Sequence, residues 1–149
     1  MTKVSKTVVL VVMEKDFDGW NNKKKELEAK NKKGPRFRER EIWWCSIGHN
    51  LGHEACGKNE FFERPILIIH KYSSTLFIGI PLTSAVKNDR FHFCLNSVKY
   101  HIKKTDKIIK PYVMLSHIKS LSSVRLIRSI DIVSRSELKK VQKELYKWI

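Results

Sequence analysis

The chain has 149 residues, of which 42% are hydrophobic and 30% are charged. This composition suits one folded domain and excludes a disordered chain, and no apolar run approaches the ~20 residues that cross a bilayer, so we expect no membrane partner. The 30 basic and 15 acidic residues give a net charge of +15, which favours nucleic acid as a partner over a basic surface that is merely solvated.

The N-terminal segment holds one short apolar stretch, Thr7–Val12, behind two lysines. It is at the short end for the core of a signal peptide, and MEKDFD follows where small residues at a cleavage site are expected. We therefore expect a strand or a disordered leader here, with Met13 as an alternative start of the natural chain.

Residues 14–33 (EKDFDGWNNKKKELEAKNKK) are predicted to form an amphipathic helix that begins near Asp18, with Trp20 and Leu27 as packing residues. The sequence GPRFRER then breaks the helix with a glycine and a proline. We therefore divide the chain into an N-terminal extension with an arm helix, residues 1–36, and one domain, residues 37–149.

This domain is predicted to be mainly β, a compact barrel of about six short strands. Two nearly continuous apolar runs, Arg64–Tyr72 and Leu76–Ser84, have the composition of strands that are buried on both faces. The short turn SST joins them, so we expect an antiparallel hairpin whose second strand ends at Pro81. The other predicted strands are EIWWCSI, RFHFCL, SVKYHIKK, PYVML and VRLIRSIDIV, and a loop fills residues 48–63.

The C-terminal sequence SRSELKKVQKELYKWI is the clearest helix. Ser134 and Glu137 have the spacing of a capping box, in which a hydroxyl and a carboxylate satisfy the first backbone amides. Apolar residues recur at helical intervals and predict one face that packs on the barrel, namely Leu138, Val141, Leu145 and Trp148.

The loop sequence IGHNLGHEACG raises the question of a metal site. His49 and His53 are four residues apart, and Glu54 and Cys56 are further potential ligands. However, the glycines in this stretch disfavour a helix, and the HExxH order is absent because the glutamate follows the second histidine. We therefore expect a loop without a bound metal, and no cofactor.

The cysteines give no sign of a disulfide framework. Their number is odd and no CxxC pair is present, which also argues against a cysteine zinc site. A protein of the reducing cytoplasm fits this pattern. The three positions are Cys45, Cys56 and Cys94.

A candidate anion site follows from the predicted hairpin. Arg64 stands before a proline at the start of the first strand, and Thr83 and Ser84 close the second strand. Taken singly, these are an ordinary surface arginine and ordinary turn hydroxyls. In an antiparallel pair, however, the two ends lie close together, and a guanidinium beside a hydroxyl is suited to bind a phosphate.

The order of these motifs resembles the PemK/MazF family of toxin endoribonucleases. EIWWCSIGHNLGHE, ERPILII and LFIGIPLTS match a family pattern of a strand like GDIWWV, a loop glutamate, RPVLIL and a strand ending in PLT. LSHIKSLSSVRL (Leu115–Leu126) matches a later segment like LSQIRTID. The resemblance covers residues 37–149 and implies a small SH3-like β-barrel with a C-terminal helix. It also implies a homodimer that cleaves single-stranded RNA without a metal and that a cognate antitoxin protein blocks.

The resemblance carries roles for particular residues. Arg64 matches the catalytic arginine of the family, and Thr83 matches its hydroxyl. Glu54 matches the glutamate of the loop, and His53 matches a histidine that some members have there. Ser116 occupies a position that is acidic in some members and serine in others.

Four positions depart from the family pattern. Ala55 and His117 stand in place of glutamine, Lys119 in place of arginine, and Ser122 in place of aspartate. The arginine and the threonine nearest the chemistry are unchanged. We therefore expect shifted RNA contacts or cleavage specificity, and a weakened or inactive member stays open.

Metal-free RNA cleavage uses the 2′-hydroxyl as an internal nucleophile and needs a base, an acid and positive charge at the phosphate. Arg64 can supply the charge, and the resemblance implies that it also takes part in proton transfer, although an arginine is a poor base. His53 and His117 are candidates to help, since histidine titrates near neutral pH; the alternative for His117 is a packed or surface imidazole. Thr83 would hydrogen-bond a phosphate oxygen. The expected products are a 2′,3′-cyclic phosphate and a 5′-hydroxyl.

RNA contacts are expected from basic residues around an aromatic platform, although such a charge run can also be a solvated face. The candidates are Lys58, Ser84, Lys99, Tyr100, Lys103 and Lys119. Two other functions stay open: a binding module of the same fold without activity, and a toxin of the related barrel that blocks DNA gyrase. Arg64 and Thr83 favour the nuclease, because a gyrase blocker needs no phosphate-cleaving site.

Overall fold

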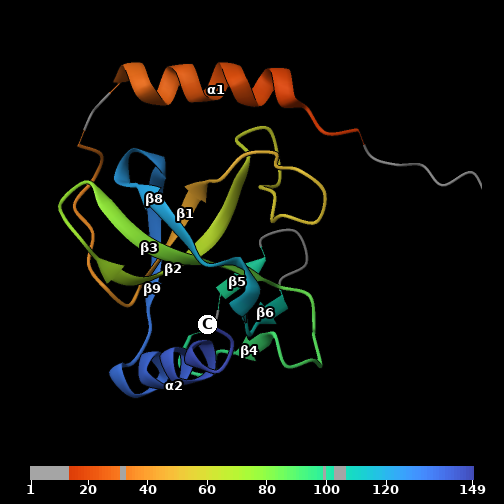
Figure 1. Ribbon diagram of the computed structural model, residues 1–149, viewed down its shortest axis with the longest axis vertical. Helices are drawn as coiled ribbons and strands as arrows, with labels where there is room; N and C mark the ends of the chain where they lie inside the picture. Colours follow the sequence, from red (N-terminus) through yellow and green to blue (C-terminus); the bar gives the residue numbers. More distant parts are fainter. Residues whose placement is uncertain (1–13, 31–32, 99, 103–106) are drawn as a thin grey trace, which may run out of the picture.

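The computed structural model describes residues 14–30, 33–98, 100–102 and 107–149 (Figure 1). Four predictions of the sequence analysis fall outside these ranges, those for Thr7–Val12, Met13, Lys99 and Lys103. In chain order the described elements are α1 (Phe17–Lys30), β1 (Glu41–Ser46), β2 (Glu63–Lys71), β3 (Leu76–Thr83), β4 (His92–Cys94), β5 (Tyr100–Ile102), β6 (Lys107–Ile109), β7 (Tyr112–Met114), the 3-10 turn η1 (Leu115–His117), β8 (Lys119–Ser122), the 3-10 turn η2 (Ser123–Arg125), β9 (Leu126–Ile132) and α2 (Arg135–Tyr146). No helix among these is long and apolar enough to cross a membrane.

The predicted arm helix is confirmed as α1, which begins one residue before the expected start. Asp16 caps it, because its Oδ1 accepts a hydrogen bond from the amide of Gly19 at 2.8 Å. Most of the helix is exposed; of the two predicted packing residues, Trp20 is buried and Leu27 is only half-buried. The helix lies along one side of the sheet, and α2 lies on the opposite side (Figure 1).

The predicted hairpin of β2 and β3 is also confirmed, with Ile66 paired to Pro81 and Leu67 to Ile80. The expected end at Pro81 is wrong, since β3 continues to Thr83. Pro81 lies between the part of β3 that pairs with β8 and the part that pairs with β7, so neither of those ladders needs the N–H that proline lacks.

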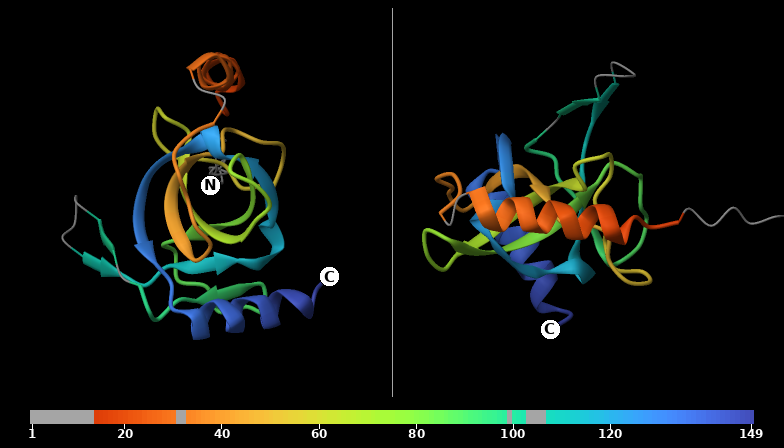
Figure 2. Two further views of the ribbon diagram at one scale, coloured as in Figure 1. Left: turned by 90° about the vertical axis from the view of Figure 1, so that its left-hand side faces the viewer. Right: turned by 90° about the horizontal axis from the view of Figure 1, so that it is seen from above.

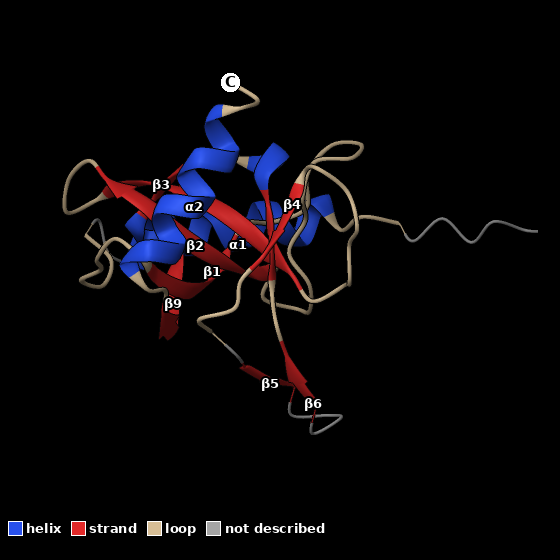
Figure 3. Ribbon diagram, turned by 90° about the horizontal axis from the view of Figure 1, so that it is seen from below, coloured by secondary structure: helices blue, strands red, loops and turns tan. Residues whose placement is uncertain are grey.

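The strands form one curled antiparallel sheet of seven strands in the order β4-β7-β3-β2-β1-β9, with β8 paired to β3. Seen end-on, they curl into a ring (Figure 2). The expectation of a small barrel is met in shape, but among the described strands β9 pairs only with β1, and β4 only with β7, so hydrogen bonding does not close the ring. The remaining strands, β5 and β6, form a separate two-stranded ribbon that projects from the sheet (Figures 2 and 3).

Two hydrophobic clusters fill the two sides of the sheet. One joins α2 to β3, β7 and the loop after β4 through Leu82, Val113 and Leu95, all fully buried. The other lies on the opposite face of the strands and includes Phe77 and Cys45. Burial of apolar surface on both sides fixes which residues of each strand face inward, because side chains alternate along a strand.

The C-terminal helix is confirmed, and so are three of the four residues of its predicted apolar face: Leu138, Val141 and Leu145 are buried. Ser134 caps the helix as predicted, accepting from the amide of Glu137 at 3.2 Å. The other half of the predicted capping box, in which the Glu137 carboxylate satisfies a backbone amide at the start of the helix, is wrong. The carboxylate of Glu137 instead accepts hydrogen bonds from the loop after β4, which removes it from the helix start. Trp148 lies beyond the last helical residue and is 42% exposed.

Candidate functional site

The guanidinium of Arg64 is held at the start of β2 by three different segments. Its Nε donates to the backbone oxygen of Cys56 at 2.7 Å, and its Nη1 donates to that of Leu82 at 3.2 Å. Nη1 also lies 3.9 Å from the sulfur of Met114 on β7. Arg64 is half-buried, so the positive charge is oriented by backbone carbonyls and still reaches solvent.

Thr83 lies opposite Arg64 in the sheet. The β2–β3 register pairs Ile66 with Pro81, and two further residues along both strands bring Arg64 level with Thr83. Thr83 is 8% exposed, and its hydroxyl accepts from the amide of Ala85 at 3.2 Å. The cation and the hydroxyl that the sequence predicted to converge therefore share one face and one end of the hairpin.

The loop between β1 and β2 wraps back toward Arg64. The side chains of His53 and Glu54 are exposed, whereas Ala55 is buried in the cluster that includes Phe77 and Cys45. Asn50 closes the loop, because its amide donates to the carbonyls of Ile47 at 3.1 Å and Ala55 at 2.8 Å. The loop folded in this way presents the backbone carbonyl of Cys56 to Arg64.

Two of the four residues that suggested a metal, His49 and Cys56, have side-chain partners within the protein. Nδ1 of His49 accepts from the backbone amide of Asp16 at 2.8 Å, which leaves it no lone pair for a metal at that nitrogen. The sulfur of Cys56 accepts from the amide of Asn50 at 3.2 Å. Within the described ranges, no three His, Cys, Asp or Glu side chains come together in a metal-binding arrangement.

His117 ties the η1 turn to this loop. Its Nε2 lies 3.1 Å from the backbone oxygen of His53, and its Nδ1 lies 3.0 Å from the hydroxyl of Ser116. A carbonyl only accepts, so Nε2 carries the hydrogen, and in the neutral ring Nδ1 then accepts from Ser116. Both ring nitrogens of His117 are thus engaged within the protein.

The predicted RNA-binding residues are spread more widely. Lys119, half-buried on β8, pairs with Gly79 beside the hairpin, and Ser84 follows Thr83 directly. Lys58 is exposed, and its backbone bridges to Glu63 at the base of the loop. The backbone of Tyr100 lies in the ribbon of β5 and β6, which projects away from the sheet (Figure 3).

A family model described as PemK-like, MazF-like toxin of type II toxin–antitoxin system matches residues 38–149. The chain belongs to this family. No curated protein matches it by sequence. Three similar solved structures are MazF from Deinococcus radiodurans (21% identity, TM-score 0.54, covering 76% of this chain and 94% of that one), an endoribonuclease in complex with its cognate antitoxin from a mycobacterial species (14%, 0.52, 76% and 93%) and the Mycobacterium tuberculosis toxin MazF-mt6 (14%, 0.52, 72% and 94%). At these identities the likeness shows the fold.

This PemK/MazF-like toxin has a histidine–carboxylate pair that the sequence analysis did not single out. Nδ1 of His92, on β4, lies 2.7 Å from Oδ1 of Asp89. The hydrogen bond from His92 is the largest cause that lowers the pKa of the Asp89 carboxyl below 3.8. The alternation in RFHFCL could have indicated that His92 and Phe93 face opposite ways, but the neighbour of β4 could not be read from it.

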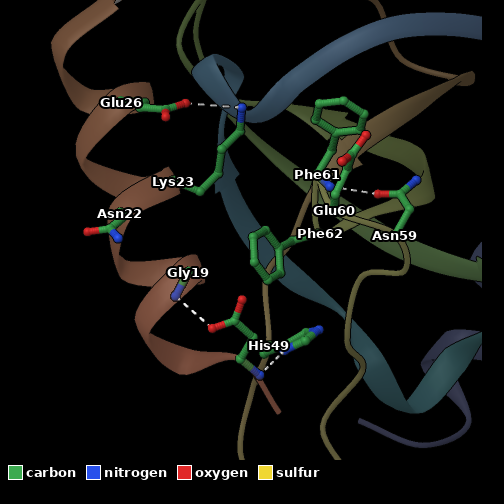
Figure 4. A pocket seen from close by; sticks show the side chains of 10 residues that line it. Gly19, Asn22, Lys23, Glu26, His49, Asn59, Glu60, Phe61 and Phe62 are labelled. Carbon is green, nitrogen blue, oxygen red and sulfur yellow. Dashed lines mark hydrogen bonds and ion pairs between the residues drawn. The ribbon is translucent and has the colours of Figure 1, made fainter.

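The toxin also has a cleft of about 480 Å³ between α1 and the segment that precedes β2 (Figure 4). Phe61 and Phe62 line one wall, and Lys23 and Glu26 of α1 line the other, joined by an ion pair of 3.5 Å. None of the predicted site residues within the described ranges lines this cleft. The cleft lies along the line of contact between α1 and the segment before β2.

Proposed function

We propose that this toxin is an endoribonuclease that cleaves single-stranded RNA, in particular mRNA, without a metal. The observation that carries the proposal is the guanidinium of Arg64, fixed by the carbonyls of Cys56 and Leu82 beside the hydroxyl of Thr83. A fixed cation next to a hydroxyl fits the charge that builds up on a phosphate under attack. Membership of the family and solved relatives named as endoribonucleases support the same reaction.

In the proposed reaction, the 2′-hydroxyl of the RNA attacks the adjacent phosphorus, and the bond to the 5′-oxygen breaks. Arg64 stabilises the negative charge of the crowded phosphate, and Thr83 holds one of its oxygens. The products are a 2′,3′-cyclic phosphate and a 5′-hydroxyl. His53, Glu54 and the η1 turn with Ser116 border the same region and would contact the RNA near the cut.

The proposed reaction also needs a group that carries the proton of the 2′-hydroxyl. The sequence analysis offered His53 and His117. The ring of His53 is exposed, so it can approach RNA. Both nitrogens of His117 are already hydrogen-bonded, which supports a role in holding the loop against the η1 turn.

For partners, we propose RNA, a second copy of the chain and a cognate antitoxin, with action in the cytoplasm. The net charge of +15 favours RNA binding, and Lys119 is the basic candidate nearest the hairpin. A relative solved in complex with its cognate antitoxin supports the antitoxin partner. Light scattering on the purified chain tests the dimer.

Primer extension on a long RNA, incubated with the purified protein in excess EDTA, tests the proposal. We expect discrete cuts from the natural protein and none from Arg64→Ala, with both proteins folded by circular dichroism. Arg135→Ala, which removes an exposed arginine on α2, is the matched control and should cleave normally.

Three other outcomes of this experiment separate the alternatives. Cleavage that stops in EDTA and returns with zinc would overturn the metal-free mechanism. RNA that is bound in a salt-sensitive way but never cut would indicate a binding module on the same fold. Neither binding nor cleavage, together with inhibition of DNA gyrase, would indicate the gyrase-blocking function.

A further inference from the structure

The sheet register places His92 on the same face as the Arg64 site. His92 pairs with Met114 across β4 and β7, and cross-strand partners project to the same side of a sheet. The sulfur of Met114 in turn lies 3.9 Å from Nη1 of Arg64. Met114 is therefore both the cross-strand partner of His92 and, through its sulfur, a neighbour of the guanidinium.

The neighbouring rows of the same ladders confirm this assignment of faces. Thr83 pairs with Tyr112, two residues before Met114, so Thr83 projects to the His92 side. Leu82, which precedes Thr83, pairs with Val113, which lies between Tyr112 and Met114. Both side chains point to the opposite face and are fully buried in the cluster that includes α2. The face that carries Thr83 and His92 is thus the one that does not pack on the helix.

The Asp89 carboxylate fixes the ring of His92 in one orientation. Its Oδ1 also accepts from the amide of Phe91 at 2.9 Å, which holds the carboxylate in place. A carboxylate accepts, so Nδ1 of His92 carries the hydrogen and the neutral ring presents a lone pair at Nε2. This is the arrangement in which a carboxylate orients a histidine for proton transfer.

Nε2 of His92 is the nitrogen that remains accessible. The side chain of His92 is 15% exposed, and no described residue forms a hydrogen bond with Nε2. Among the described residues, no buried side-chain nitrogen or oxygen lacks a hydrogen-bond partner, so Nε2 reaches solvent. His117 differs in this respect, because both of its nitrogens are occupied.

We propose that His92, oriented by Asp89, is the general base of RNA cleavage at the Arg64–Thr83 site. This inference rests on the proposed function and adds its missing proton carrier. As the bond between O2′ and phosphorus forms and the bond between phosphorus and O5′ breaks, the 2′-hydroxyl proton passes to Nε2 of His92. Solvent water gives the departing 5′-oxygen its proton, and the resulting hydroxide takes the proton back from His92.

Other titratable and charged groups on the surrounding elements contribute to the electrostatic environment of His92. They come from its own loop, from β4 and β7 and from β2, and are Lys87, Asp89, Arg90, Cys94, Tyr112 and Arg64. The lysine and the two arginines carry positive charge at neutral pH, and Asp89 balances one of these charges next to the ring.

The test is single-turnover cleavage of a short RNA that contains the mapped cut site, in EDTA, across a range of pH. His92→Ala and His92→Gln should slow cleavage by roughly 10²–10⁴-fold while RNA affinity stays unchanged. The glutamine can still donate to Asp89 but cannot take a proton, so it separates loss of the base from loss of packing. Added imidazole should partly rescue His92→Ala.

His70→Ala is the matched control, because His70 also pairs with a carboxylate, Glu39 at 3.1 Å, but at the other end of β2. It should cleave at the natural rate. The cleavage rate of the natural protein should fall at acidic pH, as its base takes up a proton. The His92 variants should not show this fall. The proposal would be overturned if His92→Gln cleaved at the natural rate, or if the His92 variants still lost activity at acidic pH as the natural protein does. Either result would leave the proposed nuclease function intact. A natural protein that cuts no RNA would overturn the proposed function, and this inference with it.

Discussion

The indole of Trp20 lies directly on the backbone of Gly48, where a Cβ would be only 2.0 Å from the ring. This contact joins α1 to the loop between β1 and β2. The same loop holds Arg64 through the carbonyl of Cys56 and His117 through the carbonyl of His53. The arm is therefore connected to the candidate site through a single loop.

Trp20→Ala should detach α1 and destabilise the protein by about 3 kcal/mol, in the range of large-to-small changes of a buried aromatic. Trp20 is 6% exposed and packs on Phe62 with a centroid distance of 5.5 Å. Urea unfolding gives the free energy, and hydrogen exchange should show faster exchange in α1 and in the loop. Trp148→Ala, at a 42% exposed site, should cost well under half as much. Equal costs would contradict the packing role of Trp20.

Gly48→Ala should also displace the arm. Gly48 has a φ of +82°, which disfavours a side chain, and the added Cβ would collide with Trp20. Gly52→Ala is a close control, because its φ is +51° but no atom lies within 4 Å of the new Cβ. We expect only the backbone cost of ~1 kcal/mol for Gly52→Ala, and at least twice that for Gly48→Ala in thermal unfolding. The contact with Trp20 would be unimportant if the two losses were equal.

Ala55→Gln restores the residue that the family pattern usually has, but we expect it to destabilise this chain. Ala55 is 5% exposed and packs in the cluster with Phe77 and Cys45, so a longer amide would overpack the cluster and bury polar atoms without partners. The expected loss is ~2–3 kcal/mol, measured by urea unfolding. Glu54→Gln, at the exposed neighbour, should change stability by less than ~0.5 kcal/mol.

Glu137→Gln should loosen the joint between α2 and the loop after β4. The Oε1 atom of Glu137 accepts from the amides of Asn96 at 2.8 Å and Ser97 at 3.0 Å and from the Ser97 hydroxyl at 3.0 Å. An amide oxygen is a weaker acceptor than a carboxylate, so we expect a loss of ~1–2 kcal/mol in the free energy of unfolding. Glu144→Gln, which breaks an ion pair with Lys147, should have little effect.

The Cys45 thiol should make the protein sensitive to alkali. Burial raises the pKa of this thiol from 9.0 to about 12, against the lowering influence of Arg125 and Lys119. Above pH 9 the unfolded chain loses this proton while the folded chain keeps it. The contribution to stability is therefore complete below pH 9 and falls by about 1.4 kcal/mol per pH unit as the pH rises toward 12.

Urea unfolding between pH 8 and 11 measures this effect. The natural protein should lose stability more steeply with pH than Cys45→Ala, which has no thiol at this position. Cys94→Ala keeps the buried thiol and should follow the natural curve. Parallel curves for the natural protein and Cys45→Ala would contradict the assignment.

Local pattern in the sequence determined much of this fold. The two apolar runs predicted β2 and β3 as a buried hairpin. Antiparallel pairing places the start of the first strand beside the end of the second, and this alone brings Arg64 level with Thr83. Helical periodicity and a serine cap predicted α2. These features depend on residues that are close in the sequence, so the order of residue types is sufficient to predict them.

Only the tertiary structure decided which distant groups meet. Backbone carbonyls hold Arg64 and His117, and a carbonyl leaves no trace in the residue type that provides it. The position of His92 beside the site depends on β4 pairing with β7 across an intervening ribbon, a register that local pattern does not encode. The sequence alone therefore determined the hairpin and its arginine, while long-range pairing decided the loop that orients this arginine and the histidine that shares its face.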